Sequence, residues 1–437
     1  MKDGGIMSRR EIKVGMLGLG TVGRGVCRLL AENGPLIEQR VGAGVTLKRI
    51  LVRDALRDRG VVLPTGLLTT NVEDILSDPE IEVVIEVMGG TGPALTYVLA
   101  ALRSGRSVVT ANKDMVSAHG RELFQAAEEG GADILFEASV AGGIPIITPL
   151  KESLAANRIL SLHGIINGTT NYILTRMTKE GLDLAEALAE AQKAGYAEAD
   201  PAADVEGLDA ARKLAILASI AFNTRILPQD VSVEGIMSVT AEDIGYAREL
   251  NYTVKLLAIA RETVQGIDVR VHPAFVPSGH PLASVSGVFN AVFVLSDAAG
   301  ESMFFGRGAG EMPTASAVVA DVMDAVRHLL YRAPGLFGCT CFETKPLKPP
   351  GLVETRFYLR LQVADRPGVL ASIAQIFGDN EVSLAQVVQK QVGDLAELVV
   401  VTHRVREAGL RQALATIGCL PVVRKIASVI RVEGEDY

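Results

Sequence analysis

Short apolar runs alternate with amphipathic stretches through the first third of the chain. The apolar runs lie at residues 12–17, 47–52, 82–88 and 107–110, and helical stretches lie at 24–32 and 93–104. Apolar runs without polar alternation are typical of parallel strands that helices cover on both faces. The alternation of such strands with helices predicts an α/β fold with a doubly wound sheet.

The middle of the chain predicts an open sheet backed by helices, which is an α+β arrangement. Strands are predicted at 160–166, 267–275, 287–295 and 302–305, and helices at 183–194, 214–222 and 317–330. We expect Thr170 or Asn171 to cap the helix that follows the first of these strands. The glycine-rich segment 132–145 is expected to be a hinge between domains.

The last part of the chain predicts a small separate domain. Residues 343–352 are rich in proline, glycine and lysine and are predicted to be a linker. Apolar residues then alternate from Phe357 to Val363, which predicts a half-buried strand. A helix starting within 365–370, strands at 382–389 and 397–403, a helix at 406–417 and a strand at 422–432 follow. This is the order β-α-β-β-α-β.

The first strand runs into G-x-G-x-x-G at residues 18–23 and then into a helix. Gly18 permits a tight turn, Gly20 allows a pyrophosphate to approach the main chain, and Gly23 lets the helix and strand pack closely. The N–H groups that begin the helix are then available to the phosphates. This context predicts a dinucleotide site of the Rossmann type. The alternative is a tight turn without a ligand.

Length supports a division into three domains, because 437 residues correspond to roughly three units of about 150. The glycine cluster at 306–310 precedes a helix that is expected to return to the first domain and touch the dinucleotide. The predicted domains are a Rossmann-type domain at 11–140 plus about 312–342, a substrate and dimerisation domain at 141–311, a linker at 343–352, and a βαββαβ domain at 353–437.

Composition excludes several classes of protein. Apolar residues make up 48% and charged residues 22%, which is ordinary for a globular chain, and the net charge of −8 disfavours nucleic acid as the main partner. Four cysteines are too few for a disulfide scaffold and are expected to be reduced. Residues 1–10 are polar and basic, are expected to be disordered, and do not resemble a secretory signal. No apolar stretch is long enough for a membrane span.

The second strand ends near Arg53 and Asp54, where dinucleotide-binding domains select their cofactor. An acidic residue there binds the adenine ribose of NAD, whereas arginine suits the 2′-phosphate of NADP. Arg57 and Arg59 add positive charge, so NADP is favoured, while NAD stays open through Asp54. The alternative for Arg53 is a charge on a solvated loop.

Glycines at 89–92 follow the third strand, where the carboxyl end of a central parallel strand faces the ligand. The next strand ends at Thr110, and Lys113 comes shortly after it. Lys113 is therefore predicted at the ligand crevice, as a catalytic candidate or as an ordinary surface lysine.

An acidic stretch within 195–213 leads into the apolar run that follows it. Asp209 and Lys213 are four residues apart and share a helix face, with Lys213 at the polar end of an apolar stripe. A lysine in this position suits proton transfer, and Glu198, Asp204 and Asp209 provide carboxylates for a substrate amino group. The alternative is an exposed ion pair worth a few tenths of a kcal/mol.

Glu137 lies where a strand breaks into small residues and glycines. Its carboxylate suits either of two roles, ligation of a cation together with nearby carbonyl groups or hydrogen bonding to the N–H groups of the loop. The residues alone leave both open.

Six segments resemble those of homoserine dehydrogenases, and a seventh resembles the ligand-binding turn of ACT domains. The six are GLGTVG at 18–23, VTANK at 109–113, FEASVAGGIP at 136–145, INGTTNYIL at 166–174, GYAEADPAADVEGLDAARK at 195–213 and GRGAGEMPTASAV at 306–318, and the turn is DRPGVL at 365–370. The resemblance extends over nearly all of residues 12–435 and is most specific at 195–213.

This resemblance implies the reversible, NAD(P)-dependent interconversion of L-homoserine and L-aspartate 4-semialdehyde, on the route to threonine, methionine and isoleucine. It places the two catalytic lysines of the family on Lys113 and Lys213, which shuttle the hydroxyl proton while hydride moves to the nicotinamide. The implied substrate contacts are Lys113, Gly168, Thr169, Tyr196, Glu198, Asp204 and Asp209. The implied cofactor contacts are Gly18, Leu19, Gly20, Thr21, Val22, Gly23, Arg53, Gly89, Gly90, Thr91, Thr110, Lys113, Gly310 and Glu311.

The resemblance also implies a cation and an effector. A monovalent cation, sodium or potassium, is expected at Glu137 and at the carbonyl groups of Val140, Gly142 and Ile144. The ACT resemblance implies feedback by an amino acid, with threonine as the expected effector, around Asp365, Gly368 and Asn380. We expect a monofunctional cytoplasmic enzyme, a homodimer or homotetramer, with no nucleic-acid or membrane partner.

Three other functions are alternatives to this one. Another two-domain semialdehyde or imine oxidoreductase would share the fold. An aldehyde-oxidising enzyme that forms a thioester needs a nucleophilic cysteine near a strand end, whereas Cys27 lies in a predicted helix and Cys339 and Cys341 lie near the linker. A non-catalytic amino-acid sensor on a dehydrogenase scaffold is disfavoured because both candidate catalytic lysines are present.

Overall fold

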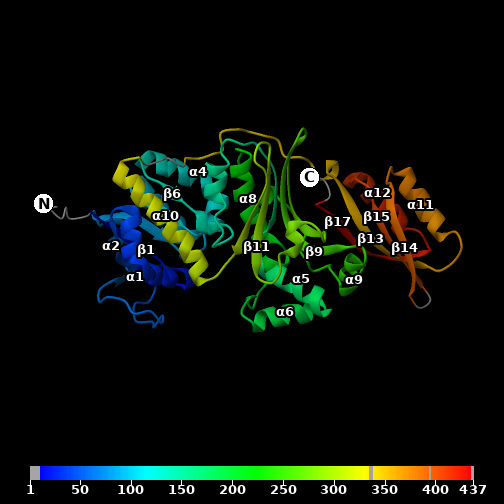
Figure 1. Ribbon diagram of the computed structural model, residues 1–437, viewed down its shortest axis with the longest axis horizontal. Coiled ribbons are helices and arrows are strands. Elements are labelled where there is room, and N and C mark those ends of the chain that lie inside the picture. Colours follow the sequence, from blue (N-terminus) through cyan, green and yellow to red (C-terminus); the bar gives the residue numbers. More distant parts are fainter. Residues whose placement is uncertain (1–9, 334–337, 393–394, 435–437) are drawn as a thin grey trace, which may run out of the picture. The chain divides into compact units, whose positions relative to one another are not determined.

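The computed structural model describes residues 10–333, 338–392 and 395–434 (Figure 1). By their contacts the residues form two units. The first comprises Met1–Arg158, Ala215–Pro228 and Ser296–Thr344, and the second comprises Ile159–Leu214, Gln229–Leu295 and Lys345–Tyr437. This two-part division leaves the boundaries of the three predicted domains a prediction. The expected disorder of residues 1–10 concerns a segment whose first nine residues lie outside the described ones.

The first unit contains a parallel sheet in which all the strand pairs run in the same direction. Its order is β3 (Leu68–Thr69), β2 (Gly44–Leu51), β1 (Glu11–Leu17), β4 (Ile81–Glu86), β5 (Ser107–Thr110) and β6 (Ile134–Leu135). The strands predicted in this region are confirmed. The chain proceeds outward from β1 on one side and then from β4 on the other, so the strand order reverses between β1 and β4. Such a switch point is where open α/β sheets bind ligands.

Helices cover this sheet. They are α1 (Thr21–Val41), the short α2 (Glu73–Leu76), α3 (Gly92–Arg103), α4 (Lys113–Gly130) and α10 (Glu311–Tyr331). Helix α10 runs beside α1 (Figure 1), and a Cβ atom at Gly25 would lie 2.6 Å from the carbonyl oxygen of Glu311. The absence of a side chain at Gly25 therefore lets the two helices approach closely.

Two of these helices are longer than predicted. Helix α1 continues past Glu32 and contains Pro35, because Ile37 and Val41 extend its buried face. Helix α10 begins at Glu311 rather than near 317, and its first turns pack against α1. In both helices tertiary packing outweighs the local propensity signals.

The second unit contains a long mixed sheet. Its order is β11 (Phe289–Ser296), β7 (Ile159–Ile165), β9 (Tyr252–Thr263), β10 (Gly266–Pro277), β17 (Val423–Val432), β13 (Glu354–Ala364), β15 (Leu395–Thr402) and β14 (Leu384–Val392). The short strand β8 (Ser232–Val233) pairs with β10, and the short strand β16 (Val405–Arg406) pairs with β13. Strand β12 (Gly300–Arg307) belongs to the first unit by its contacts. Strand β9 is absent from the prediction, because Lys255 and Arg261 interrupt its apolar pattern although it forms a twelve-residue hairpin with β10.

The helices of the second unit lie between these strands along the chain. They are α5 (Gly168–Glu180), α6 (Leu184–Lys193), α7 (Ala202–Val205), α8 (Leu208–Ala221, whose end passes into the first unit), α9 (Ala241–Glu249), α11 (Val369–Asp379) and α12 (Glu407–Gly418). The prediction that Thr170 or Asn171 caps α5 is wrong. The cap is Asn167, whose side chain accepts a hydrogen bond from the Thr170 main chain, so the helix begins three residues earlier. None of the described helices combines the length and apolar composition that a bilayer crossing needs.

The predicted βαββαβ order of the tail domain, residues 353–437, is confirmed. Phe357, Leu359, Leu361 and Val363 are all buried in a cluster with side chains of α11 and α12. The prediction that β13 is half-buried is wrong, because its second face is buried as well. Arg360 on that face is 5% exposed, since α9 covers it and supplies the carboxylate of Asp243.

The tail domain extends the sheet of the second unit rather than standing apart from it. Strand β17 pairs in parallel with β10, with Ala274 opposite Arg431 and Phe275 opposite Val432. The ring of Phe275 also stacks on that of Tyr358, with centroids 4.4 Å apart. We call this junction the β10–β17 seam.

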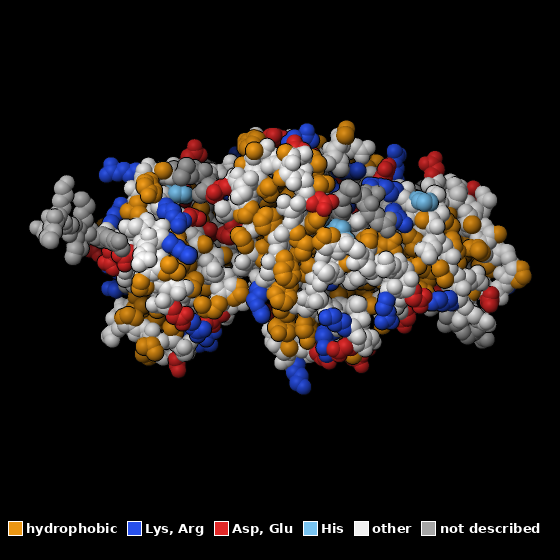
Figure 2. Space-filling view, in the orientation of Figure 1, with side chains coloured by type: hydrophobic (Ala, Val, Ile, Leu, Met, Phe, Trp, Pro, Cys, Tyr) orange, Lys and Arg blue, Asp and Glu red, His pale blue; other side chains and the backbone are white. Residues whose placement is uncertain are grey.

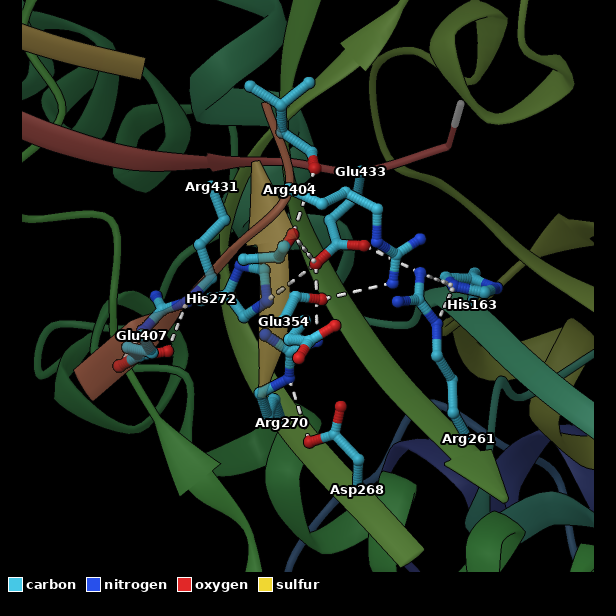
Figure 3. A network of polar contacts seen from close by, with 12 residues as sticks. His163, Arg261, Asp268, Arg270, His272, Glu354, Arg404, Glu407, Arg431 and Glu433 are labelled. Atoms are coloured by element: carbon cyan, nitrogen blue, oxygen red, sulfur yellow. Dashed lines mark hydrogen bonds and ion pairs between the residues drawn. The ribbon is translucent and has the colours of Figure 1, made fainter. Parts of the chain in front are cut away.

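Glu433 follows β17 and is almost fully buried beside the seam (Figure 3). Its carboxylate accepts hydrogen bonds from Arg261 at 2.7 Å and from Arg270 at 3.4 Å. Arg270 also forms an ion pair with Asp268 at 3.0 Å, and Arg261 contacts the Nε2 atom of His163 on β7 at 2.9 Å. Two buried carboxylates therefore balance two guanidinium groups.

Charge rather than burial decides the ionisation of Glu433. Burial alone would raise the pKa of Glu433, but the charges of Arg261 and Arg270 outweigh it and hold that pKa below its ordinary value. Burial lowers the pKa of His163 and that of His272 well below the usual value, so these rings are neutral. The ionic part of the network consists of carboxylates and arginines.

Replacing Glu433 with glutamine is expected to lower the free energy of unfolding of the second unit by about 3–5 kcal/mol, because it removes the buried carboxylate that pairs with both Arg261 and Arg270. The measurement is chemical denaturation of the full chain, with Glu354→Gln as the control. Glu354 pairs with Arg406 at the surface, so its loss is expected to cost at most about 1 kcal/mol.

The difference between wild type and Glu433→Gln also depends on pH. Because folding lowers the pKa of Glu433, its contribution is complete above the unfolded value of about 4.3 and shrinks as the pH falls below it. Equal stability of the two proteins at pH 7 would contradict this account of the seam.

Candidate functional site

The glycine turn after β1 leaves room for a ligand at the switch point. Gly18 has φ +103°, and a Cβ atom there would lie 2.9 Å from the carbonyl oxygen of Val87. A Cβ at Gly23 would lie 2.7 Å from the carbonyl oxygen of Gly18, whereas one at Gly20 would meet no described atom within 4 Å. Gly20 precedes α1 without a side-chain cap, so N–H groups of the first turn are available to an anion.

The second glycine turn is organised by a buried glutamate that was not predicted. Glu86, at the end of β4, accepts hydrogen bonds from the main chain of Met88 at 2.8 Å and Gly89 at 3.2 Å, and from the hydroxyl of Thr110 at 2.6 Å. Gly89 and Gly90 both have positive φ. The available signal was an acidic residue inside an apolar run, three positions before the first of the glycines.

Lys113 lies next to this turn. It is the first residue of α4, and Asn112 caps that helix while donating a hydrogen bond to the carbonyl oxygen of Gly90 at 2.7 Å. The structure therefore brings Thr110, Lys113 and the 89–91 turn together at the carboxyl ends of β4 and β5.

The loop after β2, which carries the predicted cofactor-binding residue Arg53, is exposed. Arg53 lies at the surface, and the Asp54 carboxylate accepts a hydrogen bond from the Leu56 main chain at 2.8 Å. Farther along the chain, Gly310 has φ +122° and precedes α10. Glu311 at the start of α10 faces Arg24 and Arg28 of α1, at 3.4 Å from each.

Glu137 is engaged by the loop that follows it. Its two carboxylate oxygens accept hydrogen bonds from the main chains of Ile146, Ile147 and Thr148 at 2.6, 2.8 and 2.7 Å. Its own N–H group donates to Asp321, where burial, reinforced by the Glu137 charge, raises the pKa of the carboxyl well above its usual value.

The predicted cation position therefore depends on carbonyl groups. Gly142 has φ +50°, and a Cβ atom there would lie 2.5 Å from the carbonyl oxygen of Gly308, so a side chain has no room. Within the described ranges, no group of three or more His, Cys, Asp or Glu side chains suits a metal ion. The remaining candidate ligands are the carbonyl oxygens of Val140, Gly142 and Ile144 on the loop that Glu137 orders.

A compact polar cluster lies at the junction of β7 and α5 in the second unit. Lys213 donates to Asp209 at 2.6 Å and to the carbonyl oxygen of Ile166 at 2.9 Å. Asn167 donates to Asp204 at 2.6 Å and to Asp209 at 2.9 Å. The side chains of Lys213 and Asp209 are 13% and 12% exposed, so the pair differs from the exposed surface pair that was the alternative.

The other predicted substrate residues differ in how closely they are packed. A Cβ at Gly168 would lie 3.0 Å from the carbonyl oxygen of Val288, and the hydroxyl of Thr169 donates to the carbonyl oxygen of Tyr196 at 2.7 Å. Tyr196 is 46% exposed, on the loop that also carries Glu198. The hydrogen bonds described above for the cluster of Asp204, Asp209 and Lys213 do not involve the Glu198 carboxylate.

The predicted regulatory turn lies at the start of α11. Gly368 has φ +87° and precedes this helix, and Asp365 is exposed. Asn380 ends the helix and donates to the carbonyl oxygen of Ile376 at 2.8 Å. The turn is therefore accessible, whereas the amide of Asn380 is already used in the helix end.

Family models match three successive parts of the chain. The NAD-binding domain of homoserine dehydrogenase matches residues 18–137, homoserine dehydrogenase itself matches 145–323, and the ACT domain matches 357–418. These matches agree with the parallel sheet, the second sheet and the tail domain.

Relatives and solved structures agree with these models. Homoserine dehydrogenase of Bacillus subtilis is 44% identical over 431 residues, which is 98% of this chain and 100% of that protein. The crystal structure of a homoserine dehydrogenase from Thiobacillus denitrificans superposes with a TM-score of 0.92 at 44% identity, covering 97% and 99% of the two chains. A hyperthermophilic archaeal homoserine dehydrogenase in complex with NADPH has a TM-score of 0.62 at 27% identity, covering 72% of this chain and 97% of that one.

Full-length identity of this degree, three matched domain models and a shared fold leave a single assignment. The chain belongs to the homoserine dehydrogenase family and is an oxidoreductase with an NAD-binding domain and a C-terminal ACT domain.

Proposed function

We propose that this chain catalyses the reversible, NAD(P)-dependent interconversion of L-homoserine and L-aspartate 4-semialdehyde, and so serves the biosynthesis of threonine, methionine and isoleucine. The observation that carries the proposal is the hydrogen-bonded cluster of Asp204, Asp209 and Lys213, in which Asp209 is buried and the other two are partly buried, in a chain whose relatives are homoserine dehydrogenases. Carboxylates suit the ammonium group of an amino-acid substrate, and a lysine held by Asp209 and by the carbonyl group of Ile166 suits proton transfer.

Each candidate residue has a role in this proposal. Lys113 and Lys213 move the proton of the substrate hydroxyl. Glu198, Asp204 and Asp209 bind the substrate ammonium group. The main chain and side chains of Gly168, Thr169 and Tyr196 complete the substrate site and orient the reacting carbon.

The residues of the first unit fit a dinucleotide. The open space at Gly20 and the uncapped start of α1 suit a pyrophosphate, and Gly89 to Thr91 adjoin Lys113. When bound, the nicotinamide ring accepts or supplies the hydride. We favour NADP because Arg53 is exposed and Asp54 is engaged by the Leu56 main chain, and the archaeal relative was solved with NADPH.

We further propose a monovalent cation, sodium or potassium, near Glu137. The carbonyl oxygens of Val140, Gly142 and Ile144 are ligands of the type that such ions prefer, and the Glu137 carboxylate holds the loop that presents them. The cation would stabilise the loop rather than enter the reaction.

Regulation and assembly complete the proposal. The exposed turn at Asp365 and Gly368 supports binding of an amino-acid effector, and threonine is our candidate. Met303 and Phe305 of β12 are 36% and 55% exposed, and hydrophobic side chains gather where Figure 1 places β11 (Figure 2), which supports association with a second copy. A homodimer or a homotetramer would cover such a surface.

The direct test is a spectrophotometric assay of the purified full chain with homoserine and either NADP or NAD. An increase in absorbance at 340 nm is expected, and it is expected to be faster with NADP. No increase with either dinucleotide would overturn the proposed reaction.

Lys213→Met is expected to lower kcat by about 10²–10⁴-fold, the usual contribution of a positioned proton-transfer group. Steady-state kinetics with homoserine measure this. The matched control is Lys179→Met, which removes an exposed lysine from α5 and is expected to leave kcat at the wild-type value. Full turnover by Lys213→Met would remove its assigned role.

Arg53→Ala is expected to lower kcat/KM for NADP by about 10–100-fold, because a hydrogen bond between charged groups contributes about 1.5–3 kcal/mol. The value for NAD, which lacks the 2′-phosphate, serves as the internal control and is expected to change little. Equal losses with both dinucleotides would show that Arg53 does not select the cofactor.

Asp365→Ala is expected to raise the threonine concentration needed for half-maximal inhibition by at least about tenfold. Inhibition curves for the wild type and the variant provide the measurement, each normalised to its own rate without threonine. If threonine inhibits neither the variant nor the wild type, threonine regulation is overturned and the tail domain has a structural role.

A further inference from the structure

We propose that Asn167 is a positioning residue of the dehydrogenase reaction, whose single amide group holds the Asp204 and Asp209 carboxylates together and orients Asp209 towards Lys213. The inference rests on the roles proposed above for Asp209 and Lys213. Asn167 was not among the residues predicted from the sequence.

The orientation of the Asn167 amide is fixed by its acceptor side. Its Oδ1 atom accepts hydrogen bonds from the main-chain N–H and from the hydroxyl of Thr170, both at 2.9 Å. The NH₂ group must therefore face the other way, towards the carboxylates. It donates to Asp204 at 2.6 Å and to Asp209 at 2.9 Å, which uses both of its hydrogens.

This geometry places a neutral donor between two like charges. The amide draws the two carboxylates to one point without adding a second positive charge to that of Lys213, so negative charge is left for a substrate ammonium. A lysine or arginine in place of Asn167 would bring a second cation to the cluster and compete with that ammonium. Asn167 is 5% exposed, so water contributes little to reducing the repulsion between the two carboxylates, and the amide has to do so.

The same residue links the carboxylates to the rest of the candidate site. Because Asn167 caps α5, it fixes the start of the helix at Gly168 and Thr169, and the preceding carbonyl group of Ile166 accepts the Lys213 hydrogen bond. Two consecutive residues at the end of β7 thus hold the functional groups of α7 and α8, which lie about forty positions farther along the chain.

The test uses two variants that preserve the helix cap, Asn167→Ser and Asn167→Asp, in the full chain. Serine and aspartate cap helices about as well as asparagine, but neither retains the two N–H donors. For Asn167→Ser we expect KM for homoserine to rise by at least about tenfold and kcat to fall, while KM for the dinucleotide stays at the wild-type value. For Asn167→Asp the added charge is expected also to move the pH profile of kcat/KM towards higher pH.

Asn171→Ser is the matched control. Asn171 is a buried asparagine of the same helix, and its amide bonds to Phe289 and Lys255 instead of to the carboxylates. This variant is expected to lower the melting temperature while leaving KM for homoserine and the pH profile unchanged. Thermal melting and dinucleotide-binding fluorescence of every variant identify any that fails to fold.

Two results separate the possible failures. If the wild type oxidises homoserine and both Asn167 variants keep wild-type KM, kcat and pH profile, the positioning role is overturned and the proposed function stands. If the wild type does not oxidise homoserine with either dinucleotide, the proposed function and the positioning role are overturned together.

Discussion

The second unit depends on the requirement that every buried charge meet an opposite charge or a sufficient set of hydrogen-bond partners. Arg360 of the tail domain is paired with Asp243 of α9, and Arg431 of β17 is paired with Glu234. Each partner lies more than a hundred residues away in sequence. Because such pairs are costly to break, they fix the positions of segments that the chain alone would leave independent.

Polar side chains at the starts of helices also fix the positions of neighbouring segments, and they do so in both units. Asn112 caps α4 and also holds the carbonyl group of Gly90, and Asn167 caps α5 and also holds two carboxylates. An asparagine suits this double use because it carries an acceptor and two donors on one rigid plane. In each case the beginning of a helix and a neighbouring loop are fixed by one side chain, which gives the candidate sites a rigid base.

Local features of the sequence allowed much of this fold to be predicted. The strands next to the glycine turns and the order of elements in the tail domain follow from short-range patterns and are confirmed. Strand β9 was missed because Lys255 is buried and Arg261 partly buried, each against partners that lie elsewhere in the chain. The two-sided burial of β13 likewise depends on α9, which no local pattern indicates.

In the candidate site, too, local sequence patterns identified some residues and missed others. Spacing along one helix identified Asp209 and Lys213, because residues four apart share a face. It gave no indication of Asn167, whose importance comes from its contacts with Asp204 and Asp209, about forty residues farther along the chain. Residues that act by contact with distant segments are the ones that reading a single sequence misses.

The β10–β17 seam bears on how such a chain can be divided or recombined. A regulatory domain joined only by a linker can be exchanged between relatives as a cassette, but here the tail contributes a strand to the sheet and a carboxylate to the adjoining arginines. A chimaera that exchanges the tail must therefore carry matched residues on both sides of the junction. In evolutionary terms, the tail and the sheet that it completes are constrained to change together.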